Sequence, residues 1–141
     1  MLLIDDLTRA TWIVLLKEKL ETFKHFKKFK AQVENEKYLN IKLLRLERGG
    51  EYNSSEFEEL YEKHNILTKY SVARTPQQNG LVERKNRTIQ EMVRAMLDEA
   101  GMPQNFWGEA AREVVYISNE TQLRRNSDRN PYDLWNGRHV H

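Results

Sequence analysis

The first half of the chain passes from strand-like to helix-like spacing of its apolar residues. Two short apolar runs, residues 2–4 and 11–16, flank the segment D-D-L-T-R-A, which predicts two strands joined by a tight turn. A stripe with helical spacing follows, which predicts an amphipathic helix whose apolar face carries Leu20, Phe23, Phe26, Phe29 and Val33. Residues 41–46 then predict a buried strand, and Ser55 with Glu58 predicts a capping box that starts a short helix.

The second half begins with alternation over residues 66–72, which predicts another strand. The segment T-P-Q-Q-N-G, residues 75–80, predicts a loop, and Glu83 is expected in the first turn of the helix after it. That helix carries the apolar stripe Ile89, Met92, Val93, Met96 and Leu97. A last helix over residues 104–119 is predicted from Phe106, Trp107, Ala110, Ala111, Val114 and Ile117. Strands that alternate with helices predict an α/β fold.

Length and composition limit the class of protein. A chain of 141 residues predicts one domain, residues 1–141, with one hydrophobic core. Hydrophobic residues make up 39% and charged residues 31%, and no run of eighteen apolar residues exists, so no membrane segment is expected. The chain has no cysteine, and its apolar start is too short for a signal peptide. These features predict a nuclear or cytoplasmic protein.

Basic residues gather in two segments, although the net charge is only +2. The lysines of the first segment are expected on the solvated back of the Leu20–Val33 helix, and they are Lys17, Lys19, Lys24, Lys27, Lys28 and Lys30. The second segment lies beside Glu83 and contains Arg84, Lys85, Arg87 and Arg94. For Arg84 and Lys85, a contact with nucleic-acid phosphates and an ordinary solvated surface are both open interpretations.

Five segments together carry a family resemblance. They are I-D-D-L-T-R-A-T-W, G-G-E-Y, T-P-Q-Q-N-G-x-x-E-R-K-N-R-T-I, F-W-G-E-A and N-P-Y-D-L-W-N-G, in that order over nearly the whole chain. The chain resembles the integrase catalytic core of copia-type LTR retrotransposons, within the retroviral integrase family. The resemblance implies an RNase H-like fold, with a mixed sheet and flanking helices. It also implies bound Mg²⁺ or Mn²⁺, and transfer of DNA 3′ ends into a target duplex.

The resemblance also assigns site residues. Glu83 takes the place of a catalytic, metal-binding glutamate, and Glu47 takes the place of a metal-binding aspartate. The family normally has Asp followed by Asn where this chain has Glu47 and Arg48. The polar residues around Glu83 are expected to contact DNA, and they are Gln77, Gln78, Asn79, Arg84, Lys85 and Arg87. The implied partners are DNA, as element ends and target duplex, and a second copy of the chain.

Departures from the family pattern predict impaired chemistry. In the family, the first aspartate of the triad lies on a central strand upstream of the segment that resembles I-D-D-L-T-R. We therefore expect an N-terminally truncated core with its central first strand missing and two interior sheet edges unpaired. Asp5 and Asp6 fit the second strand and its turn, not the missing ligand. The sequence thus predicts an integrase core that is catalytically defective. The alternatives are a non-catalytic nucleic-acid-binding or dimerisation module and a relic without function.

Overall fold

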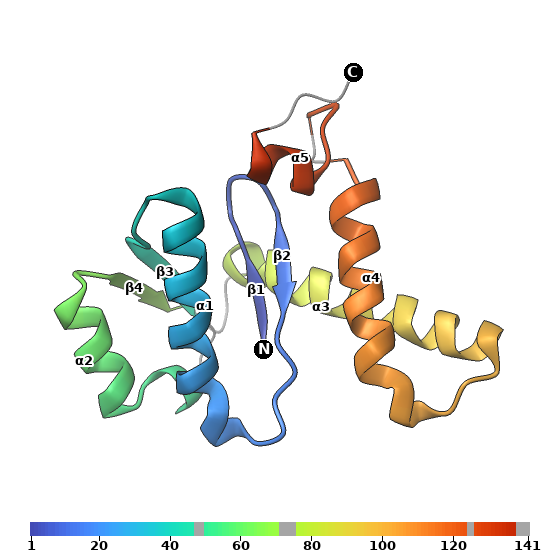
Figure 1. Ribbon diagram of the computed structural model, residues 1–141, viewed down its shortest axis with the longest axis horizontal. Coiled ribbons are helices and arrows are strands. Elements are labelled where there is room, and N and C mark those ends of the chain that lie inside the picture. Colours follow the sequence, from blue (N-terminus) through green and yellow to red (C-terminus); the bar gives the residue numbers. More distant parts are fainter. Residues whose placement is uncertain (47–49, 71–75, 124–125, 138–141) are drawn as a thin grey trace. The chain divides into compact units, whose positions relative to one another are not determined.

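The computed structural model describes residues 1–46, 50–70, 76–123 and 126–137, and the side chains among them except those of residues 50 and 76–79. The chain divides into two compact units. Unit 1 consists of Met1–Leu15 together with Leu81–His141, and unit 2 is the continuous segment Leu16–Gly80. Figure 1 shows the elements of both units. That residues 1–141 form a single domain stays a prediction.

Unit 1 begins with the predicted hairpin. Strand β1 (Leu2–Ile4) pairs antiparallel with β2 (Thr11–Ile13), with Leu3 opposite Trp12. The turn between them is closed by Asp5, whose Oδ2 accepts hydrogen bonds from the Thr8 backbone N–H at 2.9 Å and the Thr8 hydroxyl at 2.7 Å. Asp6 forms an ion pair with Arg9 at 2.7 Å. The short polar side chains of the turn therefore define the hairpin, as the sequence predicted.

Two long helices supply the core of unit 1. Helix α3 (Pro76–Ala100) presents Ile89, Val93 and Leu97, and these pack with Ala111 and Val114 of α4 (Trp107–Thr121). The apolar stripes predicted for both helices are therefore confirmed at these positions. Phe106 is 39% exposed, contrary to the prediction that it lies on the buried side. It belongs to the short 3-10 helix η3 (Gln104–Phe106), whose different pitch takes Phe106 off the α4 stripe.

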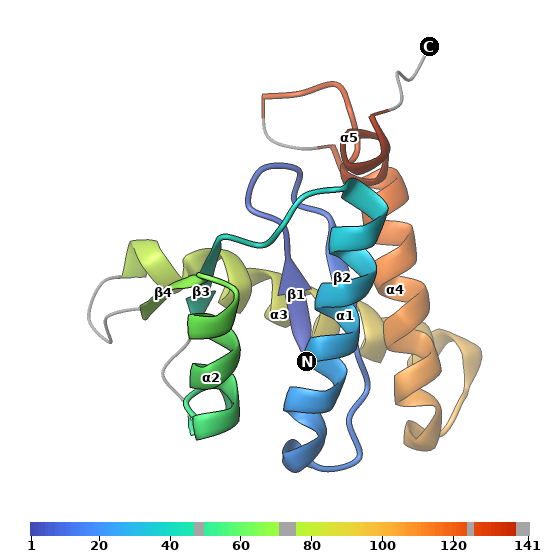
Figure 2. The same cartoon turned by 60° about the vertical axis from the view of Figure 1, so that its left-hand side comes forward.

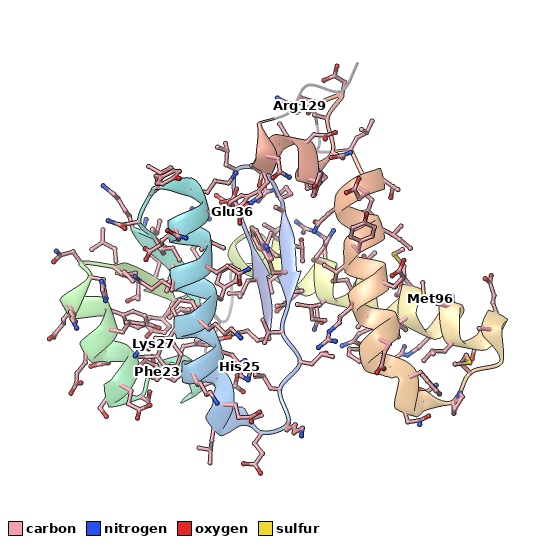
Figure 3. All side chains as sticks on the ribbon, viewed as in Figure 1. Phe23, His25, Lys27, Glu36, Met96 and Arg129 are labelled. Atoms are coloured by element: carbon pink, nitrogen blue, oxygen red, sulfur yellow. The ribbon has the colours of Figure 1, made fainter. Side chains whose placement is uncertain are left out.

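A final helix, α5 (Pro131–Asn136), forms where the sequence analysis expected no element. The Asn130 side chain caps it by accepting a hydrogen bond from the Asp133 N–H at 2.7 Å, and Gly137 ends it in the left-handed conformation. The preceding residue, Arg129, is labelled in Figure 3 and donates to the Asp133 carbonyl at 3.2 Å. The Trp135 ring meets Trp12 of β2 edge to face at 4.8 Å, which attaches α5 to the hairpin.

Unit 2 has an aromatic core centred on Phe57. It is built by α1 (Thr22–Lys37), α2 (Ser55–Lys63) and the 3-10 helix η2 (Gly50–Tyr52). The 3-10 helix η1 (Lys19–Glu21) precedes α1, and its Leu20 is 90% exposed, contrary to the prediction that Leu20 lies on the apolar face. Phe57 is 1% exposed, and the rings packed around it are Phe23, Phe26, Tyr52 and Tyr61. Figure 3 shows Phe23 and Lys27 on α1, where the Lys27 ammonium lies 5.9 Å from the Phe23 ring centre. The cap of α2 is Ser54, one residue before the predicted Ser55.

One predicted surface lysine of α1 is buried. Lys30 is only 6% exposed, and its Nζ lies 2.5 Å from Glu34 Oε1. The other oxygen of Glu34 accepts a hydrogen bond from the Ile41 backbone N–H at 2.6 Å, in the segment that leads to β3. The prediction that Lys30 is solvated is therefore wrong, because Glu34, one helical turn later, supplies the charge partner that makes burial tolerable. Lys24, Lys27 and Lys28 are exposed, as predicted.

The second strand pair of the molecule lies in unit 2. Strand β3 (Leu43–Leu46) pairs parallel with β4 (Leu67–Tyr70), with Leu44 opposite Thr68. Figure 2 shows β3 and β4 side by side with α2 beside them. Within the described ranges the molecule has two separate two-stranded sheets, β1–β2 and β3–β4. That the family's central first strand is missing stays a prediction.

Candidate active site and nucleic-acid interface

Glu83, the principal candidate for catalysis, lies on the exposed side of α3 in unit 1. The helix begins at Pro76, so Glu83 is its eighth residue and stands beyond the second turn. The prediction of a loop over residues 75–80 is therefore wrong for residues 76–80. The prediction that Glu83 lies in the first helical turn is also wrong. Proline is favoured in the first turn of a helix, so Pro76 starts α3 rather than marking a loop.

The three polar residues before Glu83 also change their setting. Gln77, Gln78 and Asn79 belong to the first turns of α3, but their side chains lie outside the described part of the structure. Glu47 and Arg48 lie outside the described residues altogether. The roles predicted for these residues, DNA contact for the first three and metal binding for Glu47, therefore stay predictions.

Arg84 and Arg87 have the surface position that a phosphate contact needs. Both side chains are exposed, and they lie three residues apart on α3, so they belong to neighbouring turns on one side of the helix. Within the ranges that the structure describes, neither arginine forms an ion pair. Two guanidinium groups are thus available beside Glu83 for phosphate oxygens.

Lys85 points the other way. Its Nζ donates hydrogen bonds to the Ser118 hydroxyl at 2.7 Å and to Gln122 Oε1 at 3.3 Å, both at the C-terminal end of α4. The Ser118 hydroxyl also donates to Gln122 Oε1 at 3.0 Å, which closes a triangle of polar groups between α3 and α4. Burial lowers the pKa of the Lys85 ammonium, since both partners are neutral. The structure therefore uses Lys85 within the protein, and the predicted DNA contact of Lys85 stays a prediction.

Ser118 and Gln122 were not singled out in the sequence. Their spacing of four residues on a helix is a signal that they share a face, but a pattern of polar residues cannot reveal that Lys85 faces them. The triangle lies between the helix that carries Glu83 and the helix packed against it. Lys85 thus contributes to the contact between α3 and α4 rather than to the exposed basic surface.

The carboxylates near the start of the chain serve other purposes. Asp5 closes the hairpin turn through Thr8, and Asp6 pairs with Arg9. That neither replaces the family's first aspartate stays a prediction. No group of three or more His, Asp or Glu side chains within the described residues could hold a metal ion. Binding of Mg²⁺ or Mn²⁺ by this chain therefore stays a prediction.

Curated relatives match nearly the whole chain. The retrovirus-related Pol polyprotein from transposon TNT 1-94 of Nicotiana tabacum is 43% identical over 137 residues, which are 97% of this chain and 10% of the relative. The corresponding polyprotein from transposon RE2 of Arabidopsis thaliana is 36% identical over 116 residues, 82% of this chain and 8% of the relative. This chain is a homologue of the integrase region of copia-type Pol polyproteins. It spans about a tenth of the length of these relatives.

Solved structures show that the fold is that of integrase cores. The simian T-cell lymphotropic virus intasome in complex with PP2A regulatory subunit B56 gamma matches with a TM-score of 0.74 at 16% identity, over 95% of this chain and 46% of that chain. The trimeric HTLV-2 integrase catalytic core domain in complex with magnesium matches with a TM-score of 0.66 at 18% identity, over 92% and 79%. The RNase H-like α/β fold predicted from the sequence is confirmed. No family model matches the chain.

The HTLV-2 core is described in dimeric and trimeric forms, both in complex with magnesium.

Among the described residues of this chain, no helix is both long enough and apolar enough to cross a bilayer.

Proposed function

We propose that this chain is the catalytic-core region of a retrotransposon integrase that retains DNA binding but is defective in 3′-end processing and strand transfer. The homology to copia-type Pol polyproteins over 97% of the chain carries the integrase part of this proposal. The defect rests on the sequence, because Glu47 and Arg48 stand where the family has Asp and Asn.

The chemistry of the metal explains why this exchange matters. Magnesium requires nearly ideal octahedral coordination at about 2.0–2.1 Å, and it gives up its water reluctantly. Glu47 is one methylene longer than aspartate, so its oxygens cannot occupy the same positions on the same backbone. Arg48 adds a positive charge beside it, which competes with a cation for nearby carboxylates. Both changes weaken metal binding at the position that Glu47 occupies.

DNA binding is supported by the surface around Glu83. Arg84 and Arg87 are exposed and form no ion pairs among the described residues, so they can neutralise phosphates without breaking an internal contact. Each phosphate that a protein neutralises on duplex DNA contributes about −0.9 to the slope of log K against log salt concentration. Replacing Arg84 or Arg87 by alanine should therefore reduce the magnitude of the slope by about one unit.

The test of the catalytic part is a strand-transfer assay on oligonucleotide duplexes with Mg²⁺ and, separately, Mn²⁺. We expect the chain to be inactive, and we expect Glu47→Asp to recover measurable product only in a polypeptide that also supplies the upstream strand with the family's first aspartate. Glu83→Gln in the Glu47→Asp background should abolish that product, while Glu91→Gln, an exposed glutamate on the same helix, should not. Strand transfer by the unaltered chain that depends on Glu83 would refute the defect and keep the integrase assignment.

A non-catalytic DNA-binding or dimerisation module is a second candidate, favoured by the same exposed arginines. Salt-dependent duplex binding without product in any Glu47 variant would support it over the defective enzyme. Self-association can be measured separately by sedimentation velocity, where the dimeric and trimeric HTLV-2 cores lead us to expect a homo-oligomer. A chain that neither binds duplex DNA nor folds would instead agree with a relic without function.

A further inference from the structure

The outer edge of β2 is closed by a side chain instead of a strand. The Asn119 carboxamide on α4 accepts a hydrogen bond from the Thr11 backbone N–H at 3.0 Å and donates one to the Thr11 carbonyl at 2.8 Å. Both contacts reach one residue across a separation of 108 positions in the sequence. One residue of an antiparallel neighbouring strand would make the same pair of contacts through its own N–H and C=O.

The register of the hairpin shows that these Thr11 groups face outward. Met1 and Val14 exchange backbone hydrogen bonds, and the Asp5 N–H donates to the Ala10 carbonyl. Hydrogen-bonded and non-hydrogen-bonded pairs alternate along an antiparallel ladder, so every second residue of β2 directs its N–H and C=O away from β1. Thr11 opposes Ile4 at such a position. The Thr11 N–H and C=O therefore have no partner on β1, and Asn119 supplies the partner for both.

Burial makes this pairing significant. Thr11 is 1% exposed, so water cannot readily replace a lost partner of its backbone. The carboxamide fits in one orientation only, with its oxygen toward the N–H and its nitrogen toward the carbonyl, because the reverse would oppose donor to donor. Asn119 thereby fixes both the position of α4 along β2 and the rotation of the helix about its axis.

We propose that Asn119 is a strand-mimicking cap, a positioning residue that sets α4 on the hairpin and prevents another strand from pairing with β2 at Thr11. This role does not depend on DNA binding or catalysis. It predicts a local signature, since the Thr11 amide is protected from hydrogen exchange by α4, whereas the Val14 amide is protected by the Met1 carbonyl at 2.9 Å.

The experiment is amide hydrogen exchange, read residue by residue by NMR on the full 141-residue chain. In Asn119→Ala we expect Thr11 to exchange about tenfold faster or more relative to Val14, because its amide loses its only acceptor across the α4 contact. Asn119→Asp keeps the acceptor for the Thr11 N–H, so it should leave Thr11 more protected than Asn119→Ala does. The matched control is Asn86→Ala, an exposed asparagine on α3, which should leave the Thr11 to Val14 ratio unchanged.

Two results would overturn the cap. A parallel loss of protection at Thr11 and Val14 would mean that Asn119 only contributes to global stability, and an unchanged Thr11 would mean that the carboxamide protects nothing. Sedimentation velocity gives an independent measurement, because an uncapped β2 edge should make Asn119→Ala associate more strongly with rising concentration than Asn86→Ala does. If Asn119→Ala does not fold, Asn119→Asp decides, because one of its carboxylate oxygens would oppose the Thr11 carbonyl. Faster exchange of Thr11 relative to Val14 than in the unaltered chain would support the cap, and an unchanged ratio would overturn it.

Discussion

The buried ion pair of α1 leads to a sharp prediction about stability. Glu34→Gln retains the size of the side chain but removes the charge that faces Lys30, whose side chain is 8% exposed. It also replaces one oxygen by an amide nitrogen, so a glutamine at this position cannot accept from both Lys30 and the Ile41 N–H as Glu34 does. The buried Lys30 and the half-buried Ile41 N–H then compete for one acceptor.

The expected cost follows from the burial of both partners. Removing one member of a buried ion pair destabilises a protein by about 3–5 kcal/mol, and the 14% exposure of the Glu34 side chain favours the lower end of that range. The surface pair of Asp6 and Arg9 provides the matched control, because its side chains are 68% and 37% exposed. Asp6→Asn should cost only about 0–1 kcal/mol.

The assay is urea unfolding at neutral pH, followed by far-ultraviolet circular dichroism, with Lys30→Met and the double variant Lys30→Met/Glu34→Gln included. Because the double variant leaves no uncompensated charge, it should lose less stability than the sum of the two single variants, with a coupling energy of about 1–3 kcal/mol. The reasoning is refuted if Glu34→Gln costs no more than Asp6→Asn, or if the single effects add.

Three further predictions concern other described contacts. Hydrogen bonds from the Lys17 and Glu18 N–H groups lower the pKa of Glu21 below its ordinary value of 4.5, so the stability they provide is present above that pH and is lost as the pH falls through the lowered pKa. Thermal melting should show Glu21→Gln less stable than the unaltered chain at neutral pH and equal to it in acid. Lys85→Met should leave the salt slope of DNA binding unchanged, measured by fluorescence anisotropy, because its amine faces α4; a slope reduced as in Arg87→Ala would contradict this. Tyr61→Phe removes the hydrogen bond to the Tyr52 carbonyl at 3.2 Å and should cost about 0.5–1.5 kcal/mol in urea unfolding, whereas no measurable change would show that this bond contributes nothing.

Periodicity predicted the main elements because the core residues follow it closely. Ile89, Val93 and Leu97 lie on one face of α3, and Phe57, Leu60 and Tyr61 on one face of α2, so burial alone selects these faces. The signal fails for short elements. Helix α5 has six residues, too few for an apolar stripe, and its sequence signals are the cap Asn130, Pro131 at the first helical position and the terminal Gly137.

The candidate site was predicted less completely, for two physical reasons. Pro76 is compatible with a loop and with the first turn of a helix, and a loop was predicted from the sequence. Charge alone cannot tell whether a cation meets solvent or a partner, which is why Lys30 and Lys85 were both placed on the surface. Their partners, Glu34 and Ser118, are found only once the helices are in place.

The divided path of unit 1 has a consequence for the order in which the chain is made. Thr11 leaves the ribosome 108 residues before Asn119, which corresponds to roughly 5–20 s of synthesis. Unit 2 is continuous and is complete before most of α3 has been translated. During that interval the hairpin is an isolated two-stranded sheet, which is marginally stable at best in water. The residues of the hairpin are therefore among the last to reach their final partners. Until α4 has been synthesised, the hairpin is accessible to the chaperones and proteases of the cell.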